Sequence, residues 1–247
     1  MRPRGGRSGG YWAGCRGASA ALVMVLPLLA IYEGGIAALG GEAALRAGVD
    51  AWIGRLTPDR FRVPDWAPSA VLALGLIAWR IAEPGRFRLA WVPLAAVECL
   101  VLGAGLLALF RGFDPWFETA GGLVPLEVAS TAEMGPKAGE VVGLVGAGIF
   151  EEAVFRLGLL GVCYAALRIL QMPNVLATAL AVSGSALAFS MAHHVGETPG
   201  AFSWSIFVFR WLAGVYFAWV MILRGFGIAV GTHLAYDLLV MVDPWAT

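Results

Sequence analysis

Charged side chains are scarce in this chain. Only 14% of its 247 residues are Asp, Glu, Lys or Arg, whereas 59% are hydrophobic. A soluble domain carries about a quarter charged residues, so this composition argues against an ordinary soluble fold and favours a membrane protein. The formal net charge is zero and the basic residues lie in loops rather than in one patch, so no nucleic-acid partner is indicated.

Cysteine is rare as well. The three cysteines, Cys15, Cys99 and Cys163, are an odd number, and two of them lie in apolar runs. No disulfide framework follows, and we expect these thiols to serve as small apolar side chains. The sequence predicts no cofactor.

The hydrophobic residues form long runs. Seven segments come near the ~20 residues that a membrane-spanning helix requires: 18–39, 67–81, 89–110, 140–169, 174–192, 204–223 and 226–242. Within the fourth, Gly143, Gly146 and Gly148 would allow close approach of neighbouring helices. We therefore predict an all-α fold, a polytopic membrane helix bundle of about seven to eight transmembrane helices. Residues 1–17 would be a basic tail, and residues 18–247 a single transmembrane domain.

The connections between these runs differ in charge. Arginines gather in the tail, in the 80–88 loop and at Arg168 and Arg224, whereas the 40–66 and 111–139 connections are rich in acids. By the positive-inside rule, this asymmetry predicts an inner (cytoplasmic) membrane protein with a cytoplasmic N-terminus. A short interfacial helix is expected over 42–56.

Three ionisable side chains interrupt the apolar run 141–170: Glu151, Glu152 and Arg156. An unpaired charge near the bilayer centre costs roughly 2.5–3.5 kcal/mol, so such a cluster is read as functional by default. Glu152 and Arg156 lie at i and i+4 and can pair. Successive helical residues diverge by about 100°, which leaves Glu151 without a local partner and suited to accept a proton. A purely structural ion network is the alternative.

All three histidines lie in two later segments. Phe189 and His193 share a helix face at i, i+4. A single histidine at a membrane boundary is also consistent with an interfacial role. His194 points elsewhere, and no direct role is expected for it. His233 and Asp237 repeat the i, i+4 spacing. Their pairing is either a structural hydrogen bond or a means of fixing the imidazole tautomer, so that a ring N–H donates to an oxyanion.

Together the three motifs resemble a known family, the CAAX-prenyl-protease and bacteriocin-processing (ABI) family of glutamate-type intramembrane endopeptidases. The resemblance covers about residues 135–242. In order along the chain, the motifs that carry it read Glu151-Glu152-x-x-x-Arg156, Phe189-x-x-x-His193 and His233-x-x-x-Asp237. The resemblance implies an endopeptidase that hydrolyses a peptide bond near the bilayer, in a peptide or protein substrate presented at the membrane.

The resemblance also implies roles for these residues. Glu151 and His193 would activate the attacking water, and Glu152 with Arg156 would hold the site in shape. The third motif would support the oxyanion, but the prenyl-protease members carry Asn where this chain has Asp237. An ionised Asp cannot donate a hydrogen bond, so we assign the oxyanion to His233 and expect Asp237 to orient it.

Other classes stay open. A zinc-dependent membrane protease could use Glu151, His193, His233 and Asp237 as ligands, but the chain has no His-Glu-x-x-His helix and no cysteine ligand set, and no metal is predicted. A non-catalytic immunity or scaffold protein is a further possibility.

An ion-coupled transporter could use other intramembrane charges, namely Glu33, Glu98 and Arg210. The chain has no inverted repeat of the usual transporter type, and we expect Glu98 and Arg210 to pair or to lie near a span end. One difficulty for the protease hypothesis is that Glu151 and His193 are expected at different depths in the membrane. Glu151 lies roughly 16 Å along its helix from Glu140, near mid-membrane, whereas His193 lies close to a span end.

Overall fold

The chain is helical. The computed structural model describes residues 10–41, 46, 64–119, 137–194 and 202–242, and these contain no strand. The helices are α1 (Tyr11–Cys15), α2 (Ala18–Ala38), α4 (Ala67–Ala82), η2 (Leu89–Trp91), α5 (Val92–Thr119), α6 (Lys137–Glu151), η3 (Glu152–Leu160), α7 (Gly161–Ile169), α8 (Asn174–Ala192), α9 (Trp204–Arg224) and α10 (Phe226–Val242). All seven segments expected as spans are helical, which confirms the predicted fold class.

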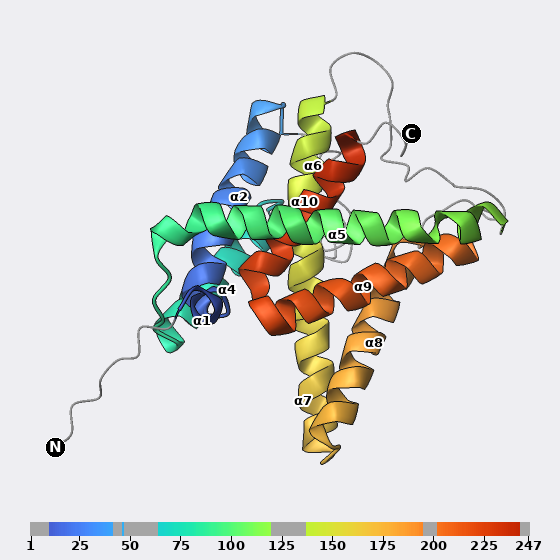
Figure 1. Ribbon diagram of the computed structural model, residues 1–247. Coiled ribbons are helices and arrows are strands. Elements are labelled where there is room, and N and C mark those ends of the chain that lie inside the picture. The colour runs from blue at the N-terminus through green and yellow to red at the C-terminus, as the bar shows by residue number, and fades with distance from the viewer. Residues whose placement is uncertain (1–9, 42–45, 47–63, 120–136, 195–201, 243–247) are drawn as a thin grey trace.

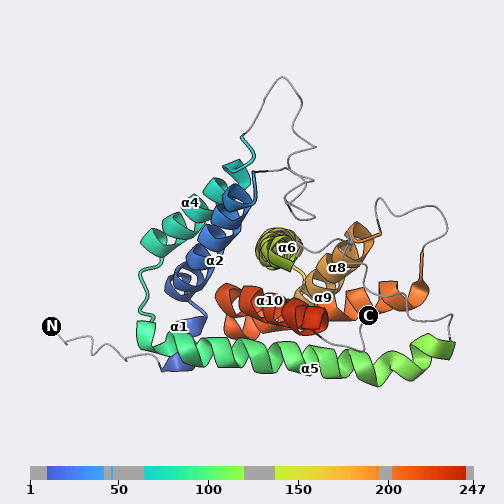
Figure 2. The same ribbon diagram turned by 90° about the horizontal axis from the view of Figure 1, so that it is seen from above.

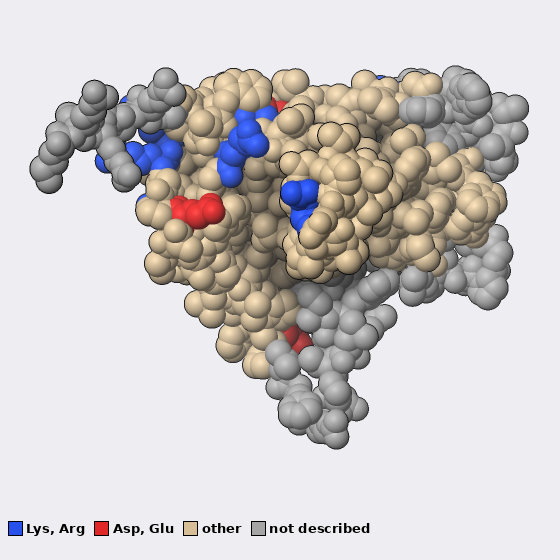
Figure 3. Space-filling view, turned by 90° about the horizontal axis from the view of Figure 1, so that it is seen from below, with Lys and Arg blue, Asp and Glu red and all other residues tan. Residues whose placement is uncertain are grey.

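Length and apolar character identify the membrane-crossing helices. Among the described residues, four stretches are long and apolar enough to cross a membrane: Ala18–Ala38, Leu89–Gly112, Asn174–Ala192 and Trp204–Arg224. Ala67–Ala82 and Phe226–Val242 are shorter apolar helices. The face drawn in Figure 3 carries few charged side chains on a surface that is mostly uncharged. The protein is therefore a multi-pass membrane protein.

A continuous rod made of α6, η3 and α7 stands at the centre of the fold (Figure 1). Viewed from above in Figure 2, the rod is seen end-on, with α2 and α4 on one side of it and α8 on the other. The long α5 runs across the direction of the rod, and α10 packs against both α5 and α6. The helices therefore cross at large angles. Counting residues along one helix does not give the membrane depth of residues on another.

Small residues let the rod contact its neighbours closely. A Cβ added at Gly146 would lie 2.2 Å from a ring carbon of Tyr32 on α2, so only glycine fits against that ring. A Cβ at Gly148 would lie 3.3 Å from the backbone nitrogen of Leu234 on α10. Gly143 faces open space. Two of the three glycines that predicted close helix approach therefore make it.

A cluster of polar and aromatic side chains holds α1 against the rest of the helices. Arg224 at the end of α9 forms a two-point ion pair with Glu98 of α5, and Tyr11 also donates a hydrogen bond to Glu98, at 2.5 Å. The Arg224 guanidinium lies 3.5 Å from the Trp12 ring centroid. We expected Glu98 and Arg210 to pair or to lie near a span end. The pairing is not found, because α9 brings Arg224, not Arg210, to Glu98, which lies in the second turn of α5.

Two boundaries also differ from expectation. Residues 11–15 of the expected basic tail form α1, whose last residue, Cys15, is fully buried. The loop expected from residue 111 begins later, because α5 continues to Thr119. The interfacial helix expected over 42–56 lies outside the described residues, apart from Arg46.

The contacts of Glu98 with Tyr11 and Arg224 predict that Glu98 controls the access of reagents to the Cys15 thiol. Burial raises the pKa of the Cys15 thiol, so this cysteine should resist alkylation while α1 is docked. Replacing Glu98 by Gln leaves Arg224 without its counter-ion, and we expect at least tenfold faster maleimide labelling of Cys15 in a background lacking Cys99 and Cys163. The exposed carboxylate of Glu83 provides the control, and labelling in Glu98→Gln no faster than in Glu83→Gln would contradict the docking role.

Candidate active site

The α7–α8 hairpin brings the first two motifs together. Glu151 lies almost as far before the end of α7 as His193 lies beyond the start of α8. Because the two helices run antiparallel from a short turn, the two residues return to the same level. The sequence suggested different membrane depths for Glu151 and His193 because the depth of Glu151 was counted from Glu140. That count is misleading, since α6 begins at Lys137 and continues the rod well beyond the α7–α8 hairpin.

A π-helical segment begins at the Glu-Glu pair. Residues Glu152–Leu160 form η3, between the regular helices α6 and α7. π-Helical turns are rare, widen the helix locally and occur often at functional sites. Phe155, Arg156 and Leu160 of this segment are buried. Nothing in the residue pattern distinguishes this segment from an ordinary α-helix, and the sequence did not predict it.

Glu151 faces the histidines of the second and third motifs. Its Oε2 lies 3.4 Å from Nε2 of His193 and 3.8 Å from Nε2 of His233. His193 Nδ1 donates to the carbonyl of Phe189 at 2.8 Å, because a carbonyl can only accept. That bond fixes the ring with Nε2 directed at Glu151. The carboxylate is buried, whereas 28% of the His193 side chain is exposed, so the site opens beside His193.

Glu152, rather than Asp237, orients His233. Nδ1 of His233 lies 2.8 Å from Oε1 of Glu152, a hydrogen bond in which the ring N–H donates. Asp237 Oδ2 lies 3.6 Å from the opposite nitrogen, Nε2, beyond hydrogen-bond distance. The two adjacent carboxylates diverge as helix geometry requires, yet both reach His233 because its ring lies between them.

Arg156 forms the floor of the site. It pairs with Glu152 at 3.3 Å, and the two side chains are 1% and 0% exposed. Its guanidinium lies 4.2 Å from the ring centroid of Phe189 and 5.4 Å from that of Phe217, so the cation sits between aromatic rings. The Phe217 ring also stacks on His233, at 4.5 Å and 14°. Sequence reasoning missed Phe217, because a phenylalanine within an apolar span carries no distinguishing signal.

His194 stands apart from this cluster, as expected. Its Nδ1 bonds the carbonyl of Ser190 at 2.9 Å, and its ring contacts Phe202 and Phe207.

The cluster combines carboxylates, imidazoles and arginines. Glu151, Glu152 and Asp237 supply three carboxylates, Arg156 pairs with Glu152, and a second arginine, Arg210, donates to the backbone carbonyl of His193 at 3.3 Å. Burying net charge is costly, so a proton taken up beside these carboxylates can be held on an imidazole. A site that holds imidazoles next to carboxylates can move protons during hydrolysis.

Metal and transport alternatives gain no geometric support. In the part of the chain that the structure describes, no group of three or more His, Cys, Asp and Glu side chains has an arrangement that could hold a metal ion. The two acids expected for an ion path are engaged: Glu33 binds Ser69 and Arg46, and Glu98 binds Arg224. They do not form a continuous line of free charges.

Comparison with known proteins identifies the region that holds these motifs. Residues 139–239 match the family described as Rce1-like, type II CAAX prenyl endopeptidase Rce1-like. This match confirms the family resemblance carried by the three motifs. No curated protein and no solved structure matched the chain.

The buried ion pair predicts a stability defect. Replacing Arg156 by Gln leaves Glu152 without its cation, and removing one partner of a buried pair costs about 3–5 kcal/mol. We expect a large fall in the unfolding temperature of the detergent-solubilised protein. Arg168→Gln removes an exposed arginine from the same rod and should change stability by less than about 0.5 kcal/mol. Equal melting of the two variants would mean that Arg156 does not support the fold.

Proposed function

Given the match of residues 139–239 to the Rce1-like family, we propose that this CAAX-type intramembrane protease is a glutamate-dependent endopeptidase. One observation carries the proposal: a buried carboxylate, Glu151, faces Nε2 of both His193 and His233. Glu152, Arg156 and Phe189 serve as supporting residues. The first motif spans the junction of α6 and η3, the second ends at His193 directly after α8, and the third lies on α10.

Glu151 and His193 activate the attacking water. Neutral His193 donates from Nδ1 to its own helix, so its Nε2 is an acceptor, like Glu151 Oε2. One water can donate its two O–H groups to these two acceptors. Glu151 takes a proton as the water oxygen bonds to the peptide carbonyl carbon. That proton then passes to the departing amine as the C–N bond breaks.

His233 stabilises the oxyanion. Its Nδ1–H is committed to Glu152, so Nε2 donates a hydrogen bond only in the imidazolium form. Three nearby carboxylates favour that form, and a fixed cationic donor stabilises negative charge as it develops on the carbonyl oxygen. Asp237 contributes by facing Nε2, and the stacked Phe217 ring restrains the imidazole.

The substrate is a peptide or protein segment presented at the membrane. A segment would enter beside His193, where the site is exposed. The family description supports a C-terminal CAAX-type segment as the first class to test. The arginine distribution supports a cytoplasmic N-terminus in the inner membrane.

Replacing Glu151 by Gln should abolish cleavage. The isosteric amide cannot accept the proton from water, and loss of a general base lowers kcat by about 100-fold or more. The assay uses purified protein in detergent with farnesylated and unmodified CAAX peptides, read by mass spectrometry of the released tripeptide. Comparative membrane proteomics of a Glu151→Gln strain would identify native precursors that keep a terminal segment.

Glu140→Gln is the matched control, since it makes the same change near the start of the same rod. It should retain full activity. A fully active Glu151→Gln protein would overturn the mechanism. A folded wild-type protein that cleaves neither peptide would redirect the search to the precursors found in cells.

Chelation distinguishes this mechanism from a zinc-dependent one. Because the proposed base and oxyanion donor are side chains, overnight treatment with 1,10-phenanthroline or EDTA should leave cleavage within about twofold of the untreated enzyme. Loss of activity that added zinc restores would favour the metalloprotease alternative.

A further inference from the structure

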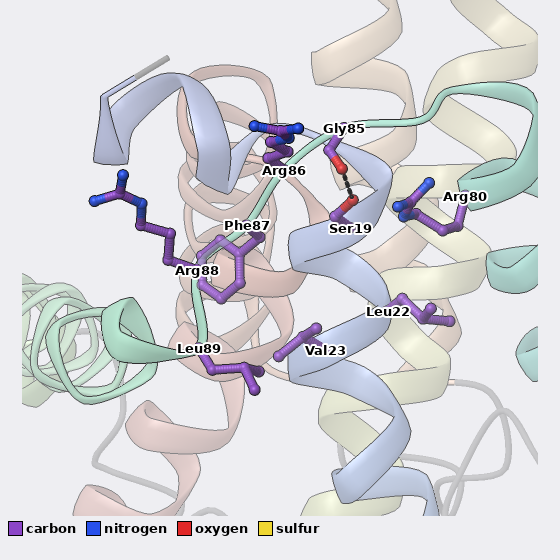
Figure 4. Close-up of a pocket in the computed structure, with 9 residues that line it drawn as sticks. All are labelled: Ser19, Leu22, Val23, Arg80, Gly85, Arg86, Phe87, Arg88 and Leu89. Carbon is purple, nitrogen blue, oxygen red and sulfur yellow. Dashed lines mark hydrogen bonds between the residues drawn. The ribbon is translucent and has the colours of Figure 1, made fainter. Parts of the chain in front are cut away.

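A cavity lies outside the active site, where α2 begins and α4 ends. Its volume is about 460 Å³, within the size range of ligand sites. Ser19 on α2 donates a hydrogen bond to the carbonyl of Gly85 at 2.8 Å, which fixes the α4–η2 connection against α2 (Figure 4). The cavity is therefore built by a tethered connection. None of its lining residues belongs to the active site.

Two arginines lie at the rim of the cavity. Arg80 comes from the last turn of α4 and Arg86 from the connection, and both line the cavity. Among the described residues, neither guanidinium has a hydrogen bond or an ion pair. The nearest acid along the chain, Glu83, accepts a bond from the Trp79 indole at 2.9 Å and does not line the cavity. An anionic ligand would satisfy both arginines.

The remaining wall is apolar. Val23 of α2 stands opposite Phe87 of the connection and Leu89 of η2, and Leu22 lies on the α2 face below Arg80 in Figure 4. Arg88 also lines the cavity, but its guanidinium points away in Figure 4 and lies 5.6 Å from the Trp91 ring centroid. Charge at one end and hydrocarbon at the other match an amphiphile with an anionic head.

The location fits the same ligand. The start of α2, the end of α4 and the start of η2 meet here, so the cavity lies where apolar helices give way to polar connections. Lipid headgroups occupy this level of a membrane, and basic pockets between membrane helices bind anionic headgroups.

We propose that this cavity binds one anionic glycerophospholipid. Arg80 and Arg86 hold the phosphate, and the first part of an acyl chain lies along Leu22 and Val23. The bound lipid would thus contact α2, α4 and the connection at once, and join them at the membrane surface.

The test is native mass spectrometry of the purified full-length protein titrated with dioleoylphosphatidylglycerol or dioleoylphosphatidylcholine. Phosphatidylglycerol should bind at one saturable site, at least tenfold more tightly than phosphatidylcholine. Each arginine near a headgroup contributes about fivefold in Kd, so Arg80→Gln with Arg86→Gln should weaken binding about 25-fold. Arg168→Gln removes one exposed arginine elsewhere and should change Kd less than twofold.

Additional variants and a competitor make the binding test decisive. If the double variant does not fold, Arg86→Gln alone, on an exposed residue, should weaken binding about fivefold, and the double Lys variant should stay within about threefold of wild type. Unchanged binding in Arg86→Gln and the double Gln variant would overturn the proposal. Equal affinity for phosphatidylcholine, or displacement by millimolar inorganic phosphate, would overturn it as well, the latter by assigning the cavity to free anions.

Discussion

The buried contact of Glu152 with Arg156 and His233 is the constraint on which the rest of the structure depends. Glu152 is fully buried and joins an arginine on its own helix to an imidazole on α10. Buried charges persist only when they are paired and hydrogen-bonded, so this contact fixes the spacing of the rod and α10. The aromatic rings of Phe189 and Phe217 complete the enclosure of Arg156. Glu151, one residue away, is then presented to both histidines.

The sequence predicted which residues meet, but not how they are arranged. The i, i+4 rule predicted the Glu152–Arg156 pair correctly, because that pair depends only on local helix geometry. The partner of His233 depends on packing between helices, and a local rule favoured Asp237 where the structure has Glu152. The pairing of Glu98 with Arg224 was missed for the same reason.

Helix direction was the other limit of prediction. Apolar length identified the seven helical segments, since any span needs about 20 apolar residues. Length carries no information on crossing angle, and α5 crosses the rod (Figure 1). The π-helical η3 and the stacking of Phe217 on His233 depend on tertiary contacts alone, and no residue pattern indicated either.

The central claim is that a single carboxylate, Glu151, serves two imidazoles. The chain has only three histidines, so ¹⁵N-histidine NMR of the detergent-solubilised protein resolves each ring, with His194 as an internal reference. We expect Glu151→Gln to shift the Nε2 signals of both His193 and His233 and to leave those of His194 in place. Unmoved signals from His193 and His233, or an equal shift at His194, would contradict it.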